Sequence, residues 1–439
     1  MRTLALALAC SLAPSALATS ITIPPSCSST LSCTASLNAA ISSCAGAPSC
    51  AISLLPGTYL LEGPEYGPRV TINNAQSLSI TGAGDATILV ANISTLFSIS
   101  SSAGVSFSSF AVDMERVPFT YGRVTSTSPA SSTVTFDATS LYRVELGRHP
   151  WLSRAQAIIS YDPVKQRFTR GTDIYALDSP IPIQYLSPPS GPAAQLAVGA
   201  PLILNDWVVL RHQVYGYNAF TASACTGLAW TNVTLWGLAG MGIYTDSCSG
   251  IAIDGLRIEK RAGRPMSITA DGVHFSNTRG GAITVRRSTF EGQGDDGLNA
   301  PTLFQFIVAL AGDGRSFQVG GRGVAGAAAP YLRAGDTAQF FARGTLLPLG
   351  AALVQSIGAN HTVLLAAPGL PPGAGLYALV NDAQQYAGSL EVTDCVFRAN
   401  RARGALLKQS NVLCARNLFE GMTASAAKTE TDGCYWQGA

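Results

Sequence analysis

The chain has 439 residues, 47% of them apolar, which is ample material for a large core with room for inserted subdomains. The formal net charge is +2 and the basic residues form no cluster, which argues against nucleic acid and anionic membranes as partners. Only 12% of the residues are charged while glycine numbers 44, a composition more typical of an all-β solenoid than of a helical bundle.

The first 18 residues resemble a secretory signal. Arg2 supplies the positive charge, residues 4–13 form a short apolar run, and Ala16 to Ala18 provide a small-residue cleavage site. The apolar run is too short for a membrane anchor, and no later stretch reaches 18 apolar residues. We therefore expect a mature chain that begins near Thr19 and is secreted and soluble. Glycosylation sequons, which are compatible with export, begin at Asn92, Asn232 and Asn360.

Cysteines crowd the start of the mature chain. Cys27, Cys33, Cys44 and Cys50 predict two disulfides, with three pairings possible. Residues 36–41 have helical character. Together these features predict an N-terminal cap in which a helix hides the open sheet edge of the first coil.

The remaining cysteines are dispersed and odd in number. Cys395 and Cys414 fall at core positions of the repeat described next, where we expect buried free thiols. The sequence has no Cys-x-x-Cys pair and its four histidines are scattered. We therefore expect neither a metal site nor a cofactor.

One repeat dominates the rest of the chain. Apolar residues recur at offsets 0, 2 and 7, as at Leu228, Trp230 and Leu235, and this pattern predicts a strand, a turn and a second strand. Each copy must stack on the next because it cannot bury its apolar face alone. We therefore predict an all-β fold, a right-handed parallel β-helix of the pectin-lyase type. Copies of the repeat begin at Leu228, Ile251, Ile283, Leu390 and Val412.

A second column of strands carries polar groups. The residue before a glycine occupies the same relative place in four copies, at Met241, Asp271, Asp296 and Arg403. The glycines permit tight bends or close backbone approach at one edge of the solenoid. Successive coils therefore present these side chains to one groove wall.

Two long segments lack the repeat. They contain alternating strands with Gly/Pro turns, and we expect small β-barrel insertions there because structureless loops of this length are improbable. The predicted organisation is a signal peptide (1–18), a disulfide-rich cap (19–53), first coils (54–112), a barrel-like insertion (113–205), coils with the site (206–301), a second insertion (302–385) and C-terminal coils without a recognisable cap (386–439).

Three carboxylates mark the candidate active site. Asp271 and Asp296 are 25 positions apart, about one turn of a parallel β-helix, and Asp295 is adjacent. Stacked strands lie about 4.8 Å apart, so all three carboxyl groups can reach one reacting centre. Crowded carboxylates repel one another and are typical of functional sites, and glycoside cleavage requires such a pair. The adjacent residues Asp295 and Asp296 can both reach the groove only if the chain bends there, and Gly294 and Gly297 facilitate such a bend.

The segments around these residues resemble glycoside hydrolase family 110. The motifs are Ala270 to Phe275, Phe290 to Asn299 and Asn400 to Gly404. Members of that family are secreted α-1,3-galactosidases that remove terminal galactose, and their fold is a right-handed β-helix with β-barrel insertions. The resemblance implies an exo-acting α-galactosidase that inverts the anomeric configuration.

The resemblance also implies roles for individual residues. It places the catalytic aspartates at Asp271, Asp295 and Asp296, and we expect Asp295 to donate the proton while the other two hold the water. Arg403 suits a sugar hydroxyl or an ion pair with the aspartates, and Tyr217 suits a sugar platform or strand packing. The predicted sugar-binding residues are Arg403, Asn299, His274, Arg211 and Tyr217.

Two alternatives remain open. Polygalacturonases and pectate lyases use the same fold, although the basic residues near the motif do not form the arrangement that a lyase needs. A β-helix that binds glycans without cleaving them is the other alternative, because the family's Asn-Val-His-Gly is replaced by Asn299-Ala300-Pro301-Thr302. All three interpretations have an oligosaccharide or polysaccharide as partner.

Overall fold

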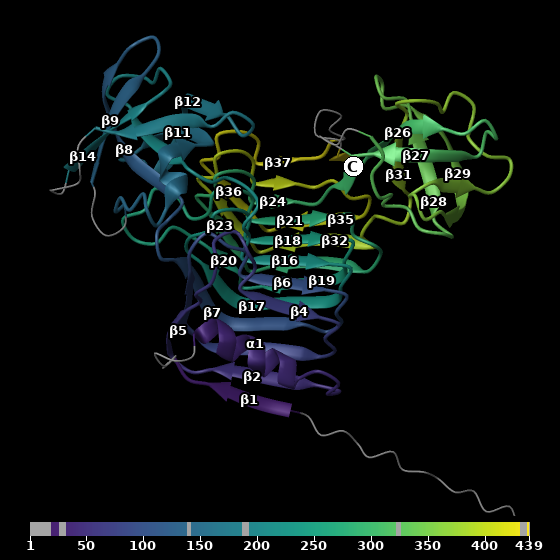
Figure 1. The fold of residues 1–439 in the computed structure, drawn as a ribbon, viewed down its shortest axis with the longest axis horizontal. Coiled ribbons are helices and arrows are strands. Elements are labelled where there is room, and N and C mark those ends of the chain that lie inside the picture. Colours follow the sequence, from purple (N-terminus) through teal and green to yellow (C-terminus); the bar gives the residue numbers. More distant parts are fainter. Residues whose placement is uncertain are drawn as a thin grey trace, which may run out of the picture.

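The computed structural model describes residues 19–25, 32–137, 142–186, 193–321, 326–430 and 437–438. Parallel strands stack coil upon coil into a column, and two further β-structures project beside its C-terminal end (Figure 1). The expected signal peptide, Cys27 and Cys434 lie outside the described residues. In the described part of the chain, no helix has the length and apolar character needed to cross a membrane.

The larger parallel sheet forms one face of the column. Its main path is β1 (Thr19–Ile23), β2 (Cys50–Leu54), β5 (Leu78–Ala91), β7 (Ser106–Met114), β17 (Thr226–Leu235), β19 (Ser249–Asp254), β22 (Ala282–Arg286), β32 (Ser389–Thr393) and β35 (Val412–Ala415). The same sheet also contains β3 (Gly57–Leu60), β20 (Arg257–Ile258), β23 (Thr289–Glu291), β33 (Val396–Arg398) and β36 (Leu418–Glu420).

The smaller parallel sheet forms a second face. Its order is β4 (Val70–Asn73), β6 (Phe97–Ser100), β16 (Phe220–Ser223), β18 (Ile243–Asp246), β21 (Val273–Ser276), β24 (Leu298–Asn299), β34 (Ala405–Leu406) and β37 (Ala427–Lys428). Each coil thus contributes strands to both sheets, which enclose one continuous apolar core.

The repeat sets the register of the coils. Leu228 pairs with Ile251, which pairs with Ile283. Ile283 pairs with Leu390, and Leu390 with Val412. The predicted alignment of the copies is therefore confirmed, and the apolar residue that begins each copy stacks on the one below.

Helix α1 (Cys33–Ser43) covers one edge of the smaller sheet. Asn38 donates to the carbonyl of Arg69 at 2.8 Å and accepts from the backbone N–H of Thr71 at 3.2 Å, so it satisfies groups that edge strand β4 leaves open. Cys44 and Cys50 form a disulfide, and Cys33 is also disulfide-bonded.

The two cysteines predicted to be buried thiols differ. Cys395 is free and buried, as expected, whereas Cys414 is free but exposed. The prediction for Cys414 is wrong because its strand, β35, ends the described stack of the larger sheet, so nothing in that sheet covers it from above.

The first insertion leaves the column between β7 and β17, which pair directly with each other. It forms an antiparallel sheet in which β10 and β12 each have one partner among the described strands, so the predicted closure into a barrel is not found there. In sheet order, its strands are β10 (Arg154–Ala155), β13 (Ile181–Tyr185), β14 (Ala193–Val198), β9 (Ser132–Asp137), β8 (Phe119–Thr127), β15 (Trp207–Arg211), β11 (Ala157–Asp162) and β12 (Arg167–Tyr175). A short 3-10 helix, η1 (Pro150–Ser153), precedes β10.

The second insertion leaves between β22 and β32, which also pair directly. It closes into a barrel of β26 (Gln305–Leu310), β27 (Ser316–Gly320), β30 (Val363–Leu365), β29 (Pro348–Ile357), β28 (Thr337–Phe341) and β31 (Leu379–Asp382). At its base, β25 (Thr302–Leu303) pairs with β38 (Gln437–Gly438). The barrel has its own apolar core, so it is a folded unit attached to the column.

Candidate active site

The predicted column of residues before glycine forms a stack. The N–H of Gly242 donates to the carbonyl of Asp271, that of Gly272 to Asp296, and that of Gly297 to Arg403. Val273 pairs with Leu298. Asp271 and Asp296 therefore occupy the same place on adjacent coils, as the sequence predicts.

Glycine is required after each of these residues by close approach of the backbones. A Cβ on Gly272 would lie 2.4 Å from the carbonyl oxygen of Gly297, and one on Gly297 would lie 2.6 Å from that of Gly404. Contacts this short are steric clashes, so only glycine lets the coils stack at this edge. The glycines thereby fix the spacing of the side chains that precede them.

The three aspartates meet in one cavity. One carboxylate oxygen from each of Asp271, Asp295 and Asp296 lies within 4.8 Å of those of the others. The chain bends between β23 and β24, which brings both members of the adjacent pair to the same side. The cavity has a volume of about 760 Å³, within the range of small-molecule sites.

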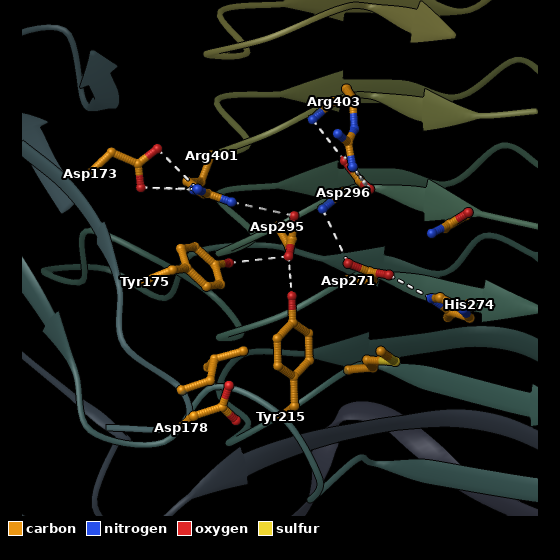
Figure 2. A pocket seen from close by; sticks show the side chains of 13 residues that line it. Asp173, Tyr175, Asp178, Tyr215, Asp271, His274, Asp295, Asp296, Arg401 and Arg403 are labelled. Atoms are coloured by element: carbon orange, nitrogen blue, oxygen red, sulfur yellow. Dashed lines mark hydrogen bonds and ion pairs between the residues drawn. The ribbon is translucent and has the colours of Figure 1, made fainter. Parts of the chain in front are cut away.

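Asp295 is surrounded by groups that stabilise a negative charge (Figure 2). Tyr175 donates its hydroxyl to Oδ2 at 3.1 Å, and Tyr215 donates to the same oxygen. Arg401 Nη1 lies 3.6 Å from Oδ1. Two hydroxyl donors and a guanidinium favour the charged carboxylate, which argues against the predicted role of Asp295 as proton donor.

Both tyrosines retain their protons as hydrogen-bond donors. Burial, with smaller effects from neighbouring charges, raises the pKa of Tyr175 to about 12. Burial also raises the pKa of Tyr215 well above its usual value, and the nearby carboxylates add to this effect. Their hydroxyl groups therefore remain protonated throughout the physiological range.

Asp296 is held by one arginine. Arg403 donates from Nε to Oδ1 at 2.8 Å and from Nη2 to Oδ2 at 2.8 Å, and its backbone N–H also donates to Oδ1 at 2.9 Å. Both oxygens are thus engaged. Burial first, and then the neighbouring carboxylates, nevertheless raise the pKa of Asp296 to about 7.

Asp271 has a different environment. It is 4% exposed, and His274 Nδ1 lies 2.6 Å from its Oδ2. The backbone N–H of Asp296 donates to its Oδ1 at 3.3 Å. Burial is the main reason that the pKa of Asp271 is raised, and a neighbouring carboxylate adds to this effect. Asp271 and Asp296 therefore hold their protons more strongly than isolated aspartates do.

The predicted sugar-binding residues divide into two groups. Asn299, His274 and Arg403 line the cavity, and Asn299 Oδ1 is buried with no hydrogen-bond partner among the described residues, so it is an acceptor available to a ligand. Arg211 and Tyr217 do not line the cavity.

The structure corrects the expected sugar contact of Arg211. This residue is 0% exposed and donates to the carbonyls of Gly294 and Thr269 at 2.6 and 3.0 Å. It ends β15 and supports the bend below the aspartates. Tyr217 packs on Tyr66, with ring centroids 5.2 Å apart. Of the two roles considered for Tyr217, packing is therefore the one that the structure favours.

Several cavity residues were not predicted. The first insertion contributes one wall, and Tyr215 lies beside it where the chain returns to the column. No sequence periodicity links the insertion to the coils, so its contribution could not be found from the repeat. Met241, predicted to lie on the groove wall, lines the cavity. The cavity residues outside the prediction are Asp173, Tyr175, Leu177, Asp178, Tyr215 and Arg401.

The aspartates could in principle offer three oxygens to a cation. However, Arg403 already engages both oxygens of Asp296, and Arg401 lies beside Asp295. These guanidiniums supply the positive charge that a metal ion would otherwise provide. The donor set therefore suits proton transfer better than metal binding.

Paired carboxylates in a cavity on a parallel β-solenoid are suited to acid–base cleavage of a glycosidic bond. The relatives of the chain agree with this class. The chain is 26% identical over 238 residues to alpha-1,3-galactosidase B of Akkermansia muciniphila, and the aligned region covers 53% of this chain and 30% of the relative. The chain is also 25% identical over 214 residues to alpha-1,3-galactosidase A of Streptomyces avermitilis, and the aligned region covers 45% of this chain and 34% of the relative.

These distant homologues support a galactosidase-like family. A third relative, alpha-1,3-galactosidase A of Shewanella woodyi, is 21% identical over 53% of this chain and 39% of its own length. The chain thus spans about a third of the length of the curated relatives it matches. No family model matches the sequence.

Solved structures resemble the chain only weakly. The A-module of mannuronan C-5 epimerase AlgE4 from Azotobacter vinelandii aligns with 90% of this chain and 69% of its own, at 9% identity and a TM-score of 0.34. The tailspike protein gp49 of Pseudomonas phage LKA1 aligns with 90% and 72%, at 12% identity and a TM-score of 0.18.

Proposed function

We propose that the protein is a secreted, exo-acting glycoside hydrolase of the family 110 type that releases terminal α-1,3-linked galactose with inversion. The observation that carries the proposal is the meeting of three aspartates from adjacent coils in one cavity. The galactosidase names of the distant homologues support the substrate.

Asp295 is the proposed base. Its contacts with Tyr175, Tyr215 and Arg401 favour the charged form that a base requires. Oδ2 accepts both tyrosine hydroxyls, whereas Oδ1 has, within the described part of the chain, only the looser contact with Arg401 at 3.6 Å. Oδ1 can therefore accept a proton from an attacking water.

Asp271 is the proposed acid, in place of Asp295. Burial is the main cause of its raised pKa and favours the protonated form, against the opposing effect of the hydrogen bond with His274. Asp296 is less suitable, since Arg403 holds both of its oxygens. Against burial and the neighbouring carboxylates, which raise the pKa of Asp296, Arg403 lowers it, and the proposed role of Asp296 is to help position the water.

The spacing of the carboxylates bears on stereochemistry. Retaining enzymes keep their two carboxyl groups about 5–5.5 Å apart and inverting ones about 6.5–9.5 Å, and the nearest oxygens here lie within 4.8 Å. This spacing is closer to that of retaining enzymes. A retaining mechanism would need a carboxylate free to bond to the sugar, a role that Arg403 disfavours for Asp296 because it engages both oxygens. The proposal of inversion, with Asp295 as base, is supported by the family resemblance.

The shape and charge of the cavity support the substrate class. Leu177 and Asp178 of the first insertion wall one side, which suits the end of a glycan chain better than its middle. The cavity contains five aspartates and two arginines, both paired with carboxylates. This charge disfavours a polyuronate, so nothing in the site favours the polygalacturonase or lyase alternative.

A substrate panel tests the proposal. The mature protein and its Asp295→Asn variant are assayed with 4-nitrophenyl α-galactoside, galactosyl-α-1,3-galactose and polygalacturonate, with Asp394→Asn, an exposed aspartate paired with Arg416, as control. We expect the wild type and the control to release galactose from both galactosides, and Asp295→Asn to lose about 10²–10⁴ in kcat. Turnover of polygalacturonate alone, or binding of galactosides without turnover, would refute the proposal.

A further inference from the structure

The first insertion reaches the candidate active site through one strand. Strand β12 lies at the edge of its antiparallel sheet, and Asp173 and Tyr175 are two residues apart near its C-terminal end, so both point to the same side. That side faces the bend that carries Asp295 (Figure 2). The insertion also contacts a later coil, because Arg170 Nε donates to the carbonyl of Thr423 at 2.9 Å.

Arg401 joins this strand to the catalytic centre. Its guanidinium donates to Asp173 through Nε at 3.2 Å and through Nη2 at 3.0 and 2.9 Å, a bidentate pair. Its third nitrogen, Nη1, lies 3.6 Å from Asp295. The backbone N–H of Arg401 donates to the carbonyl of Gln293, two residues before Asp295, at 2.9 Å. Both ends of Arg401 are thus fixed.

Tyr175 completes the network. The guanidinium carbon of Arg401 lies 4.1 Å from the centre of its ring, and that of Arg211 lies 4.7 Å from it. Arg211 also donates to the Tyr175 hydroxyl at 3.1 Å, and that hydroxyl donates to Asp295. Two cations therefore hold the ring whose hydroxyl orients the carboxylate.

We propose that Arg401 is a positioning residue, held by Asp173 of the first insertion, that orients the Asp295 carboxylate and keeps it charged for its work as base. This inference rests on the proposed function, in which Asp295 is the base. It makes the insertion part of the catalytic apparatus as well as a wall of the cavity. A purely structural bridge between the insertion and the column would hold the two together without affecting the ionisation of Asp295.

The pH profile separates these roles. The groups that face Asp295 are Tyr175, Tyr215, Arg401, Arg403, Asp271 and Asp296. Removing the Arg401 guanidinium takes away a positive charge beside the base, so the base needs a higher pH to lose its proton. In Arg401→Gln, the acidic limb of the kcat/KM profile should move up by about one pH unit, and kcat should fall by roughly tenfold or more.

Three further variants sharpen the test. Arg401→Lys keeps the positive charge but loses the forked guanidinium group. It should return the acidic limb of the kcat/KM profile most of the way to its wild-type pH. Asp173→Asn should lower kcat, and adding it to Arg401→Gln should cost little more, because both act through one contact. Arg416→Gln removes a bidentate arginine with an exposed partner, Asp394, and serves as control. It should leave the profile unchanged.

A direct titration makes the result independent of turnover. The carboxyl carbons of aspartate are labelled with 13C, the Asp295 signal is assigned with Asp295→Asn, and its titration midpoint is measured by NMR in the wild type and in Arg401→Gln. An upward move of the midpoint in the variant supports the inference. An unchanged midpoint overturns it, even if the variant is less active or less stable. Absence of galactoside turnover by the wild type would refute the proposed function, while the titration would still decide the role of Arg401.

Discussion

Asp271 and Asp295 differ in the contacts of their carboxyl groups, and the difference predicts distinct kinetic effects. An acid is needed most when the leaving group is a poor one. Asp271→Asn should therefore lose about 10²–10⁴ in kcat on galactosyl-α-1,3-galactose but far less on 4-nitrophenyl α-galactoside, whose leaving group departs without protonation. Equal losses on the two substrates would contradict the assignment of Asp271 as acid.

Asp295→Asn should be equally impaired on both substrates, because attack by water is needed in each case. A small anion such as azide can occupy the space of the activated water. We expect azide to restore turnover of the nitrophenyl galactoside by Asp295→Asn, with galactosyl azide as the product seen by mass spectrometry. If azide restored turnover by Asp271→Asn and not by Asp295→Asn, Asp271 would be the base and Asp295 the acid.

The buried carboxyl groups also make stability depend on pH. A carboxyl group whose pKa is raised on folding makes the native state bind more protons than the unfolded chain, so stability falls as pH rises from the unfolded value near 4 through the folded value. For Asp296 that window ends at about 7. The raised pKa of Asp271, caused mainly by burial, has the same sign.

The variant Asp271→Asn tests this linkage. It removes one carboxyl group from the trio, so its stability relative to the wild type should be greater at pH 8 than at pH 4. Thermal denaturation of both proteins across this range measures the difference. A stability difference between the two proteins that stays constant with pH, or that changes in the opposite direction, would contradict the raised pKa of Asp271.

At the level of elements, the glycine column sets the spacing of the coils. A Cβ at Gly272 would also lie 2.8 Å from the Phe290 ring. Gly272→Ala should therefore destabilise the protein by about 1–3 kcal/mol and lower kcat, since it moves Asp271 relative to Asp296. Gly312→Ala is the matched control, because a Cβ there meets nothing within 4 Å. Chemical denaturation and kcat measure both effects, and a tolerated Gly272→Ala would argue against the column.

The coils are the part of the fold that the sequence predicts best. Each coil must bury the same apolar positions, so the register of Leu228, Ile251 and Ile283 is written in the spacing of the repeat. The same spacing brought Asp271 and Asp296 together. Contacts between coils are periodic, and periodic contacts can be read from sequence.

The parts that could not be predicted are those that the repeat does not govern. Asp173 and Tyr175 reach the site from an insertion whose orientation depends on tertiary packing. Tyr217 was predicted as a sugar-binding residue, whereas Tyr215 lines the cavity. The segment between β15 and β16 is not a strand, so alternation gave no guide to which side chain faces the cavity. Arg211 was predicted to contact sugar because the sequence does not reveal that β15 is buried on both faces.

At the level of the whole molecule, the two insertions have different relations to the site. The cavity is lined by residues of the first insertion and of the coils, and none of its lining residues comes from the barrel strands. The barrel is tied to the column by Arg279, whose Nη2 lies 2.6 Å from Asp336 and 2.5 Å from Asp382. Substitutions at these ion pairs should therefore leave cleavage of the glycosidic bond unaffected.

Arg279→Gln tests that separation. It leaves buried carboxylates without their cation, a loss of about 3–5 kcal/mol when such a pair is broken. We expect a lower thermal midpoint and faster proteolysis within the barrel, while kcat/KM on the nitrophenyl galactoside measured well below that midpoint stays within about twofold. A large fall in kcat/KM in the folded variant would show that the barrel takes part in the reaction.

The central claim is that the aspartates of adjacent coils hydrolyse a terminal α-galactoside by direct attack of water. Proton NMR of the first minutes of reaction with 4-nitrophenyl α-galactoside tests it most directly, because galactose is then released only from the cleaved bond and its anomeric signal is recorded before it mutarotates. The account predicts β-galactose as the first product and none from Asp295→Asn. Initial release of α-galactose, or undiminished release by the variant, would contradict it.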